Sequence, residues 1–341
     1  MSVSAGNPPD IINLVANWAP QIAALGALTD LRPYFSDAEI ADVPKPALED
    51  CLVDGTLYSF PNFLGTINVV AWKKLLREVG LPVAVPAHWD EFKNAVRKIS
   101  DLGSDTYGFG ARTDKSFNSA FWFFPVLWGH LGVFEDEQGH VVFNDQGTID
   151  ALAWYREIGT TGQTPVGEGV RAVRELQAQG HVGFIIDGPW MQGWFRALSG
   201  SNKLDDEYIA GLMPRAADGK RYGIANNHVM AVAEQSKVKE EAVAFIKFFT
   251  QNVEMNRVFH DDFGFVPINR SLHSTPTYME DAFFAPFVEA AEYSVAVPSK
   301  NPNLSGALEF VAVAMQGALL GGDPKQAAEE AYRSIKTLYR Q

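Results

Sequence analysis

A strand followed by a rigid turn and a tryptophan is the most informative feature of this sequence. The apolar run 182–186 precedes Asp187-Gly188-Pro189-Trp190. Gly188 permits a sharp turn and Pro189 suits the first turn of a helix. We therefore expect Trp190 at a helix start beside the carboxyl end of a strand, where open α/β sheets bind small ligands. An indole there favours stacking on the apolar face of a sugar ring, with Asp, Asn and His side chains bonding the hydroxyls. The alternative is that Trp190 is a core residue.

The composition is that of a globular protein with about two domains. The chain has 341 residues, of which 47% are hydrophobic, and its net charge is −13. Without a Lys/Arg cluster to neutralise phosphates, this charge argues against nucleic acid and anionic membrane surfaces as partners. The one cysteine, Cys51, allows no intrachain disulfide and leaves the cellular compartment open. No apolar run approaches the roughly 18 residues of a membrane-spanning helix.

Strands and helices alternate along the chain, which predicts two α/β lobes followed by a helical C-terminal region. Short β-branched runs predict strands at 10–15, 66–72, 107–111, 182–186, 208–213 and 229–233. Helical spacing of apolar residues predicts helices at 18–25, 89–103, 117–130, 149–158, 170–179 and 239–250. The last third is expected to be helical, with a helix at 304–320, a break at 321–324 and a final helix to Tyr339.

The order of several short motifs resembles that of a known family. These motifs occupy residues 6–12, 26–31, 54–61, 80–82, 89–92, 188–190, 240–246 and 264–267. Each motif is weak alone, but their order and spacing together are specific and cover nearly the whole chain. The sequence is similar to the extracellular solute-binding proteins of ABC importers, in particular the sugar-binding group that includes maltose-binding protein.

The resemblance implies a two-lobed periplasmic-binding-protein fold of type II, with the ligand in an interlobe cleft and helices at the C-terminus. It assigns the N-lobe to residues 1–67 and 223–268, and the C-lobe to residues 68–222 and 269–341. The implied hinge segments are 65–68, 222–225 and 267–270. The family opens with a signal peptide, a first strand and a first helix. This sequence starts at what would be the second strand, so we expect those parts to be absent from it.

The resemblance also implies aromatic contacts to the ligand. Trp190 is the firmest of these, with Asp187 before it. Asn17 and Trp18 fall where the family contacts sugar from the first lobe, although Trp18 could instead begin a buried helix. Phe121 and Trp122 match an aromatic position of the second lobe. Phe121 also fits a core stripe with Phe124 and Trp128 at helical spacing.

A polar rim is expected from Asn226, Asn227 and His228, which stand where the family often has two glycines. Amide and imidazole groups there suit a polyhydroxylated ligand. The alternative is that the three residues form only a turn. Gly65 matches a position that carries a carboxylate in maltose binders, so the resemblance implies a different ligand for this chain.

Catalysis is not favoured by any motif in the sequence. A glycosidase needs two carboxylates across a cleft, and nothing in the spacing of Asp187, Glu168 and Asp114 singles them out. An Asp187 that caps the following helix is the simpler explanation. The 7 histidines are scattered, so we expect no metal and no cofactor.

The sequence therefore predicts a monomeric carbohydrate-binding protein, not an enzyme, located in the periplasm or at the cell surface. Its expected partners are a mono- or oligosaccharide and the transmembrane permease subunits of an ABC transporter, with no nucleic acid. The alternatives are a glycoside-acting enzyme and a binder of a non-sugar solute with the same fold, which would use helix N-termini or Tyr pairs.

Overall fold

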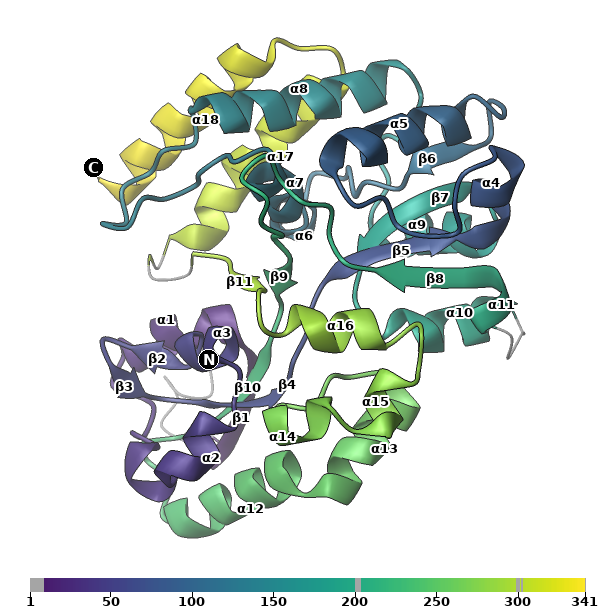
Figure 1. Cartoon of the computed structure of the whole chain (residues 1–341). Helices are drawn as coiled ribbons and strands as arrows, with labels where there is room; N and C mark the ends of the chain where they lie inside the picture. The colour runs from purple at the N-terminus through teal and green to yellow at the C-terminus, as the bar shows by residue number, and fades with distance from the viewer. Residues whose placement is uncertain (1–8, 200–203, 299–300, 302, 341) are drawn as a thin grey trace. The chain divides into compact units, whose positions relative to one another are not determined.

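The chain folds into two compact units of mixed α/β structure, as the sequence predicts. The computed structural model describes residues 9–199, 204–298, 301 and 303–340 (Figure 1). Unit 1 consists of Met1–Ile67, Gly188–Gly193 and Ala225–Pro302. Unit 2 consists of Asn68–Asp187, Trp194–Ile224 and Asn303–Gln341.

Unit 2 is built on a four-stranded sheet with the order β6-β7-β5-β8. Its strands are β5 (Asn68–Trp72), β6 (Tyr107–Phe109), β7 (Val182–Asp187) and β8 (Tyr208–Gly211). β6 and β7 run parallel, whereas β5 is antiparallel to both of its neighbours. Every residue of β7 is buried, which explains its continuous apolar sequence. Because β6 and β7 are parallel, their carboxyl ends meet at one edge of this sheet.

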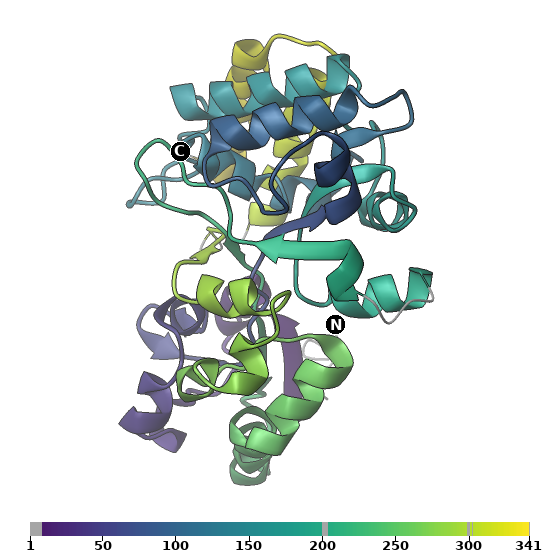
Figure 2. The same ribbon diagram turned by 45° about the vertical axis from the view of Figure 1, so that its right-hand side comes forward.

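Helices cover this sheet and extend unit 2 toward the C-terminus. α5 (Trp89–Ser100) and α9 (Val170–Ala178) pack on the strands, and Phe92 of α5 lies 4.9 Å from Phe184 between ring centroids. α8 (Gln146–Thr160), α17 (Leu304–Leu319) and α18 (Pro324–Tyr339) pack against one another (Figures 1 and 2). The predicted helical C-terminal region is thus confirmed.

The predicted helix at 117–130 is two short helices instead. These are α6 (Phe117–Phe121) and α7 (Phe124–Gly129). Pro125 has no N–H to donate to the Phe121 carbonyl, so the helical hydrogen bonding is interrupted there. Ser116 caps α6 by accepting a hydrogen bond from the Ser119 N–H at 3.1 Å.

Unit 1 contains a three-stranded antiparallel sheet with the order β1-β10-β4. Its strands are β1 (Ile11–Val15), β4 (Phe60–Phe63) and β10 (His228–Val232). The register of β10 against β4 shifts between His228, which pairs with Phe63, and Val229, which pairs with Pro61. Such a bulge turns side chains away from the regular alternation. It occurs where the sequence predicts part of the polar rim.

Two consecutive helices cover this sheet. α12 (Lys239–Gln251) packs on β4 and β10, and α13 (Val253–Phe263) follows it. Asn252 caps α13 by accepting hydrogen bonds from the N–H groups of Glu254 and Met255 at 2.9 and 3.1 Å. Gly264 ends α13 with φ of 68°, a conformation that favours glycine.

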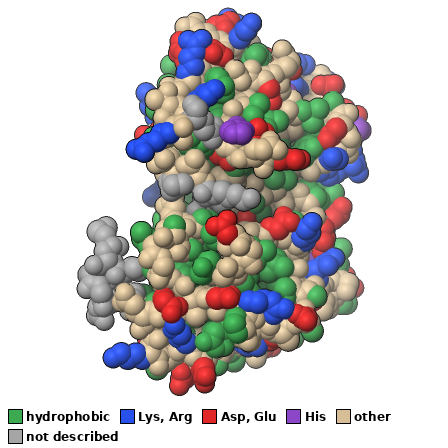
Figure 3. Space-filling model, turned by 90° about the vertical axis from the view of Figure 1, so that its left-hand side faces the viewer, with side chains coloured by type: hydrophobic (Ala, Val, Ile, Leu, Met, Phe, Trp, Pro, Cys, Tyr) green, Lys and Arg blue, Asp and Glu red, His purple; other side chains and the backbone are tan. Residues whose placement is uncertain are grey.

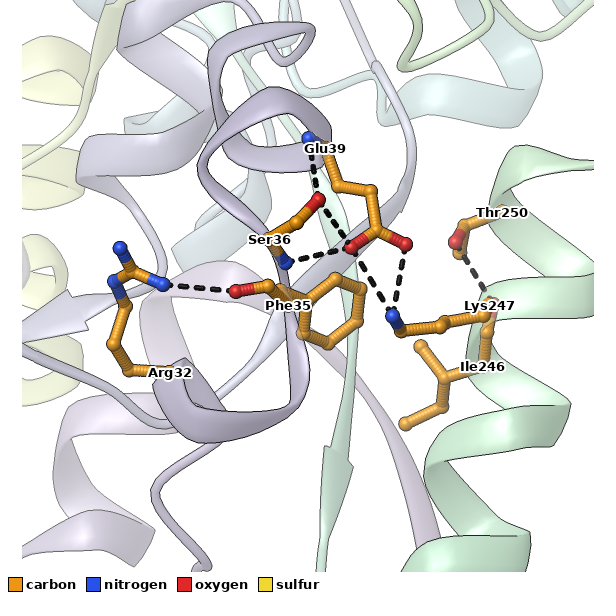
Figure 4. A network of polar contacts seen from close by, with 7 residues as sticks. All are labelled: Arg32, Phe35, Ser36, Glu39, Ile246, Lys247 and Thr250. Carbon is orange, nitrogen blue, oxygen red and sulfur yellow. Dashed lines mark hydrogen bonds and ion pairs between the residues drawn. The ribbon is translucent and has the colours of Figure 1, made fainter.

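A polar network ties α12 to the short helix α2 (Asp37–Ala41) (Figure 4). Lys247 donates to both carboxylate oxygens of Glu39 at 2.8 and 3.1 Å. Ser36 and Glu39 form a reciprocal capping box at the start of α2. Partial burial acts to raise the pKa of Glu39, but the bonds from Lys247 and Ser36 outweigh it and hold this pKa at about 2. The Lys247 ammonium also lies 5.0 Å from the centroid of the Phe35 ring.

The remaining elements are short. They are η1 (Ala16–Trp18), α1 (Ala19–Ala23), η2 (Arg32–Tyr34), α3 (Lys45–Glu49), β2 (Leu52–Val53), β3 (Thr56–Leu57), α4 (Lys73–Glu78), α10 (Met191–Ser199), α11 (Leu204–Glu207), β9 (Ile224–Ala225), α14 (Arg270–His273), α15 (Pro276–Met279), α16 (Ala285–Ala290) and β11 (Val295–Ala296).

The two units differ from the predicted lobes in which segments they contain. Residues 188–193 and 269–302 belong to unit 1, whereas the sequence analysis assigns them to the C-lobe. Hydrogen bonds explain the second difference. The Arg270 N–H donates to the Asp42 carbonyl at 2.7 Å, and the Thr66 hydroxyl donates to the Phe287 carbonyl at 2.8 Å.

Surface charge and helix length bear on the partners of this chain. Acidic and basic side chains are interspersed on the face drawn in Figure 3. Within the described ranges, no helix has both the length and the apolar character needed to cross a membrane.

Candidate functional site

A buried ion cluster lies at the edge of the unit 2 sheet where β6 and β7 end. Asp187, the last residue of β7, accepts a hydrogen bond from Arg112 at 2.9 Å and two from Arg174, both at 2.8 Å. Arg112 follows β6 and Arg174 lies on α9, so three elements are joined at one carboxylate. The Asp187 side chain is only 1% exposed. Paired charges of this kind are stable in a protein interior only when their hydrogen bonds are satisfied.

The same cluster positions a predicted aromatic contact. The guanidinium carbon of Arg112 lies 3.4 Å from the centroid of the Trp122 ring, a close cation–π contact. Burial lowers the pKa of Arg112 to about 10, while the Asp187 carboxylate acts to raise it. Arg112 therefore stays charged at neutral pH. The structure thus connects Asp187 and Trp122 through a residue that sequence analysis did not name.

The turn after β7 differs in detail from the prediction. α10 begins at Met191, so Gly188, Pro189 and Trp190 form the turn that precedes the helix. A Cβ atom on Gly188 would lie 2.3 Å from the Trp190 ring, so the indole folds back closely over a position that only glycine can occupy. A Cβ on Gly264 would lie 2.7 Å from the Pro189 carbonyl oxygen, so this position also requires close backbone approach.

Trp190 belongs to a row of aromatic rings in unit 1. It meets Phe265 edge to face with ring centroids 6.4 Å apart. Phe265 stacks on Phe63 at 3.7 Å, and Phe63 stacks on His228 at 4.6 Å. Trp190 and His228 are both half-buried. The structure therefore links two predicted ligand contacts, which lie far apart in the sequence, through two phenylalanines.

Asn227 holds three segments of unit 1 together. Its side-chain amide donates to Asp50 at 2.8 Å, its side-chain oxygen accepts from the Gly65 N–H at 3.2 Å, and its backbone carbonyl accepts from the Ala16 N–H at 2.9 Å. The residue is 2% exposed. These bonds give Asn227 a structural role that explains a polar residue at this position.

Gly65 has a local steric reason for lacking a side chain. A Cβ atom there would lie 2.0 Å from the Asn226 carbonyl oxygen, and the Asn226 N–H donates to the Gly65 carbonyl at 2.9 Å. The missing carboxylate at this position is thus a requirement of backbone packing as well as a difference from maltose binders. Asn226 itself is half-buried.

His228 remains suited to a hydroxylated ligand. Burial lowers its pKa, so the imidazole is neutral at pH 7 and offers one donor and one acceptor. Asn62 lies beside it as the unpaired residue of the β4 bulge and is 5% exposed. Within the described residues, no hydrogen bond is made to the Asn62 side-chain oxygen. Sequence analysis missed Asn62 because a bulge has no signature in a four-residue strand.

The other predicted contacts divide by exposure. Trp18 is 51% exposed, which rules out the alternative that it begins a buried helix. It follows Val15, which pairs with His228. Asn17 lies in η1, but its side chain is outside the described part of the chain. Phe121 and Trp122 are 7% and 8% exposed, which also agrees with the core alternative for Phe121.

Metal ligation has no candidate in this structure. Within the part of the chain described, no group of three or more His, Cys, Asp or Glu side chains is arranged to hold a metal ion.

Comparison with known proteins identifies the family. The family model described as bacterial extracellular solute-binding protein matches residues 1–286. The chain belongs to this family. The solute-binding protein is similar, at 25% identity over 96% of its length and 79% of the other chain, to a protein of Brucella abortus (strain 2308). It is also 24% identical to a maltotriose-binding protein of Pyrococcus abyssi (strain GE5 / Orsay), over 97% of this chain and 70% of that one.

Solved structures confirm the fold of this solute-binding protein. The sugar-binding protein MalE of Xanthomonas citri matches with a TM-score of 0.87 at 23% identity, over 99% of this chain and 86% of that one. A solute-binding protein of Thermotoga lettingae TMO, bound to α-D-tagatose, matches with a TM-score of 0.86 at 19% identity, over 99% and 87% of the two chains. The predicted two-lobed periplasmic-binding-protein fold is thereby confirmed.

Removing the carboxylate of the ion cluster should destabilise this solute-binding protein strongly. Asp187→Ala leaves Arg112 and Arg174 buried without their shared anion, so we expect a loss of about 3 kcal/mol or more in the free energy of unfolding. Asp150→Ala, an exposed aspartate on α8, is the matched control and should stay within about 0.5 kcal/mol of wild type. Urea denaturation measures both, and equal stability of the two variants would contradict a structural role for the cluster.

Asp50 should make the stability of the protein depend on pH. Burial raises the pKa of Asp50 from 3.8 to about 7, against the lowering effect of the Asn227 bond. The folded state therefore binds a proton between these values, and its stabilising contribution is lost as pH rises toward 7. Asp50→Asn should flatten the fall in melting temperature between about pH 5 and pH 8. Asp54→Asn, in an exposed turn, should keep the wild-type slope. An unchanged slope in Asp50→Asn would contradict this assignment.

Proposed function

We propose that this extracellular solute-binding protein binds a carbohydrate, either a mono- or an oligosaccharide. The observation that carries this proposal is the aromatic row in unit 1, in which half-buried Trp190 and neutral His228 are held by Phe265 and Phe63. An indole face stacks on the apolar side of a sugar ring, and an imidazole bonds its hydroxyl groups. The names of the relatives support the same ligand class, since they include a maltotriose-binding protein and a galactooligosaccharide-binding protein of Bacillus subtilis (strain 168).

The predicted contacts take different roles in this proposal. Trp18 and Trp190 offer ring faces, and Asn226 and His228 offer polar groups to hydroxyls. Trp122 is the corresponding aromatic residue of unit 2. For Asn17, Phe121 and Asn227 the proposal rests on the family resemblance, because their surroundings add no further support.

Asp187 acts indirectly in this proposal. Its oxygens already accept three hydrogen bonds from guanidinium groups, so it positions Arg112 and, through Arg112, the Trp122 ring. The same bonding argues against Asp187 as a glycosidase carboxylate, because a general acid must present a proton to its substrate. We therefore favour binding without catalysis. A glycoside-acting enzyme and a binder of another solute remain the alternative proposals.

The biological setting follows from the family and the proposed ligand. We place the protein in the periplasm or at the cell surface, where as a monomer it hands its saccharide to the permease subunits of an ABC transporter. The net charge of −13 supports the absence of nucleic acid among its partners.

A saccharide screen tests the proposed ligand class. A sugar that binds only the folded state must raise the melting temperature, so maltotriose, galacto-oligosaccharides and tagatose form the first panel. We expect at least one to bind, and Trp190→Ala to weaken its binding by about tenfold or more in titration calorimetry. Trp128→Ala, at a half-buried tryptophan in α7, is the matched control and should bind as wild type. Wild-type affinity in Trp190→Ala would remove Trp190 from the site. Turnover of a glycoside would favour the enzyme instead.

Closure of the two units on the ligand, which the family resemblance implies, is part of the proposal. A ligand whose full contacts form only in a closed state shifts the population toward that state. Small-angle scattering should therefore show a smaller radius of gyration with saturating saccharide than without it. An unchanged radius, with binding confirmed by calorimetry, would contradict closure.

A further inference from the structure

The outer side of α12 and α13 carries an unusual number of exposed apolar side chains. Phe245, Phe248 and Phe263 are 48%, 54% and 51% exposed, and Val253 and Val258 are 63% and 36% exposed. We call these five residues the α12/α13 apolar face. Single exposed apolar residues are normal on a protein surface, whereas a group of this kind marks an interaction site.

Ring contacts join the two helices of this face. Phe249, half-buried on α12, lies 5.9 Å from Phe245 and 4.7 Å from Phe259 of α13, measured between ring centroids. Phe259 in turn lies 5.6 Å from Phe263. The exposed phenylalanines are thus ends of a packed row rather than independent side chains. Such a row is held in place before any partner arrives, which lowers the entropy cost of binding.

α12 is apolar on both sides. Ala242, Val243 and Ile246 are buried toward unit 1, while Phe245 and Phe248 face outward. An amphipathic surface helix keeps its outer side polar, so the outer phenylalanines need another explanation than packing within this unit. About half of each ring is exposed, which gives on the order of 100 Å² for each of three rings. The total is comparable to the largest apolar patch of a typical soluble monomer.

Acidic side chains without basic partners accompany the face. Lys239, Lys247 and Arg257 form ion pairs with Glu234, Glu39 and Glu254, at 2.8, 2.8 and 3.1 Å. Glu240 and Glu241 on α12, and Asp261 and Asp262 on α13, are exposed and make no ion pair within the described residues. A complementary partner therefore carries positive charge. A second copy of a chain with a net charge of −13 is disfavoured for the same reason.

We propose that the α12/α13 apolar face docks an amphipathic helix that presents apolar side chains flanked by lysine or arginine. A helix laid along two neighbouring helices buries its apolar stripe against the phenylalanines and places its basic flanks beside the four acidic residues. The area is below that of a standard protein interface, so the expected dissociation constant is on the order of micromolar. This docking is independent of the proposed saccharide binding.

Two synthetic peptides test the proposal on the full chain. Each has about 18 residues and a leucine stripe, and they differ only in carrying lysine or glutamate at the flanking positions. In titration calorimetry, the lysine-flanked peptide should bind with micromolar affinity and the glutamate-flanked peptide at least about tenfold more weakly.

Variants of the face identify where the peptide binds. Phe248→Glu and the milder Phe248→Ala should each weaken the lysine-flanked peptide, the former by about tenfold or more. Glu241→Lys should reduce the preference for lysine over glutamate flanks. Val313→Glu, on α17 at 51% exposure, is the matched control and should bind as wild type. Melting curves confirm that each variant is folded, and saccharide affinity should be the same in all of them.

Several results would overturn the proposal. Equal affinity for both peptides would remove the role of charge, and unchanged binding by Phe248→Glu would place the peptide elsewhere. A dimer in analytical ultracentrifugation that dissociates in Phe248→Glu would assign the face to a second copy of the chain. Binding to zwitterionic lipid vesicles that Phe248→Glu abolishes would assign it to a membrane surface. Loss of saccharide binding in wild type would count against the proposed function and not against this docking.

Discussion

The position of the Asp187 carboxylate is the constraint on which the candidate site depends. Asp187 is the last residue of β7 and of its unit 2 segment, and the chain continues directly into the turn Gly188-Pro189-Trp190 of unit 1. Three hydrogen bonds from Arg112 and Arg174 fix this end of β7. One of those guanidiniums also holds the Trp122 ring. A single buried anion therefore determines where both tryptophans are placed by the chain.

Glycine and aromatic packing complete what the ion cluster begins. Gly188 lets the Trp190 ring fold back over the backbone, and Gly264 lets the Pro189 carbonyl approach closely. Phe265, one residue after Gly264, then meets Trp190 edge to face and stacks on Phe63. Local backbone freedom and ring packing thus act together to fix a half-buried indole. Preorganisation of this kind reduces the entropy that a ligand must overcome on binding.

The sequence was informative about elements and less so about pairwise contacts. The run 182–186 predicted a strand, and β7 confirms it, because an unbroken apolar run bounded by a turn is typical of a buried strand. The partners of Asp187 could not be predicted, since Arg112 is 75 residues away in the chain and neither arginine belongs to a motif. The expected cap role of Asp187 used only local geometry. Likewise, the bonds of Asn227 to Asp50 and Gly65 arise from segments separated by 177 and 162 residues.

The central claim is that Trp190 contacts a bound saccharide. Fluorine NMR of protein labelled with 5-fluorotryptophan tests it most directly, because each of the 8 tryptophans gives a resonance that a Trp→Phe variant assigns. On addition of a saturating saccharide, the Trp190 resonance should shift while that of Trp154, 3% exposed in the core of unit 2, stays in place. An unchanged Trp190 resonance, in the presence of a saccharide whose binding calorimetry confirms, would contradict the account.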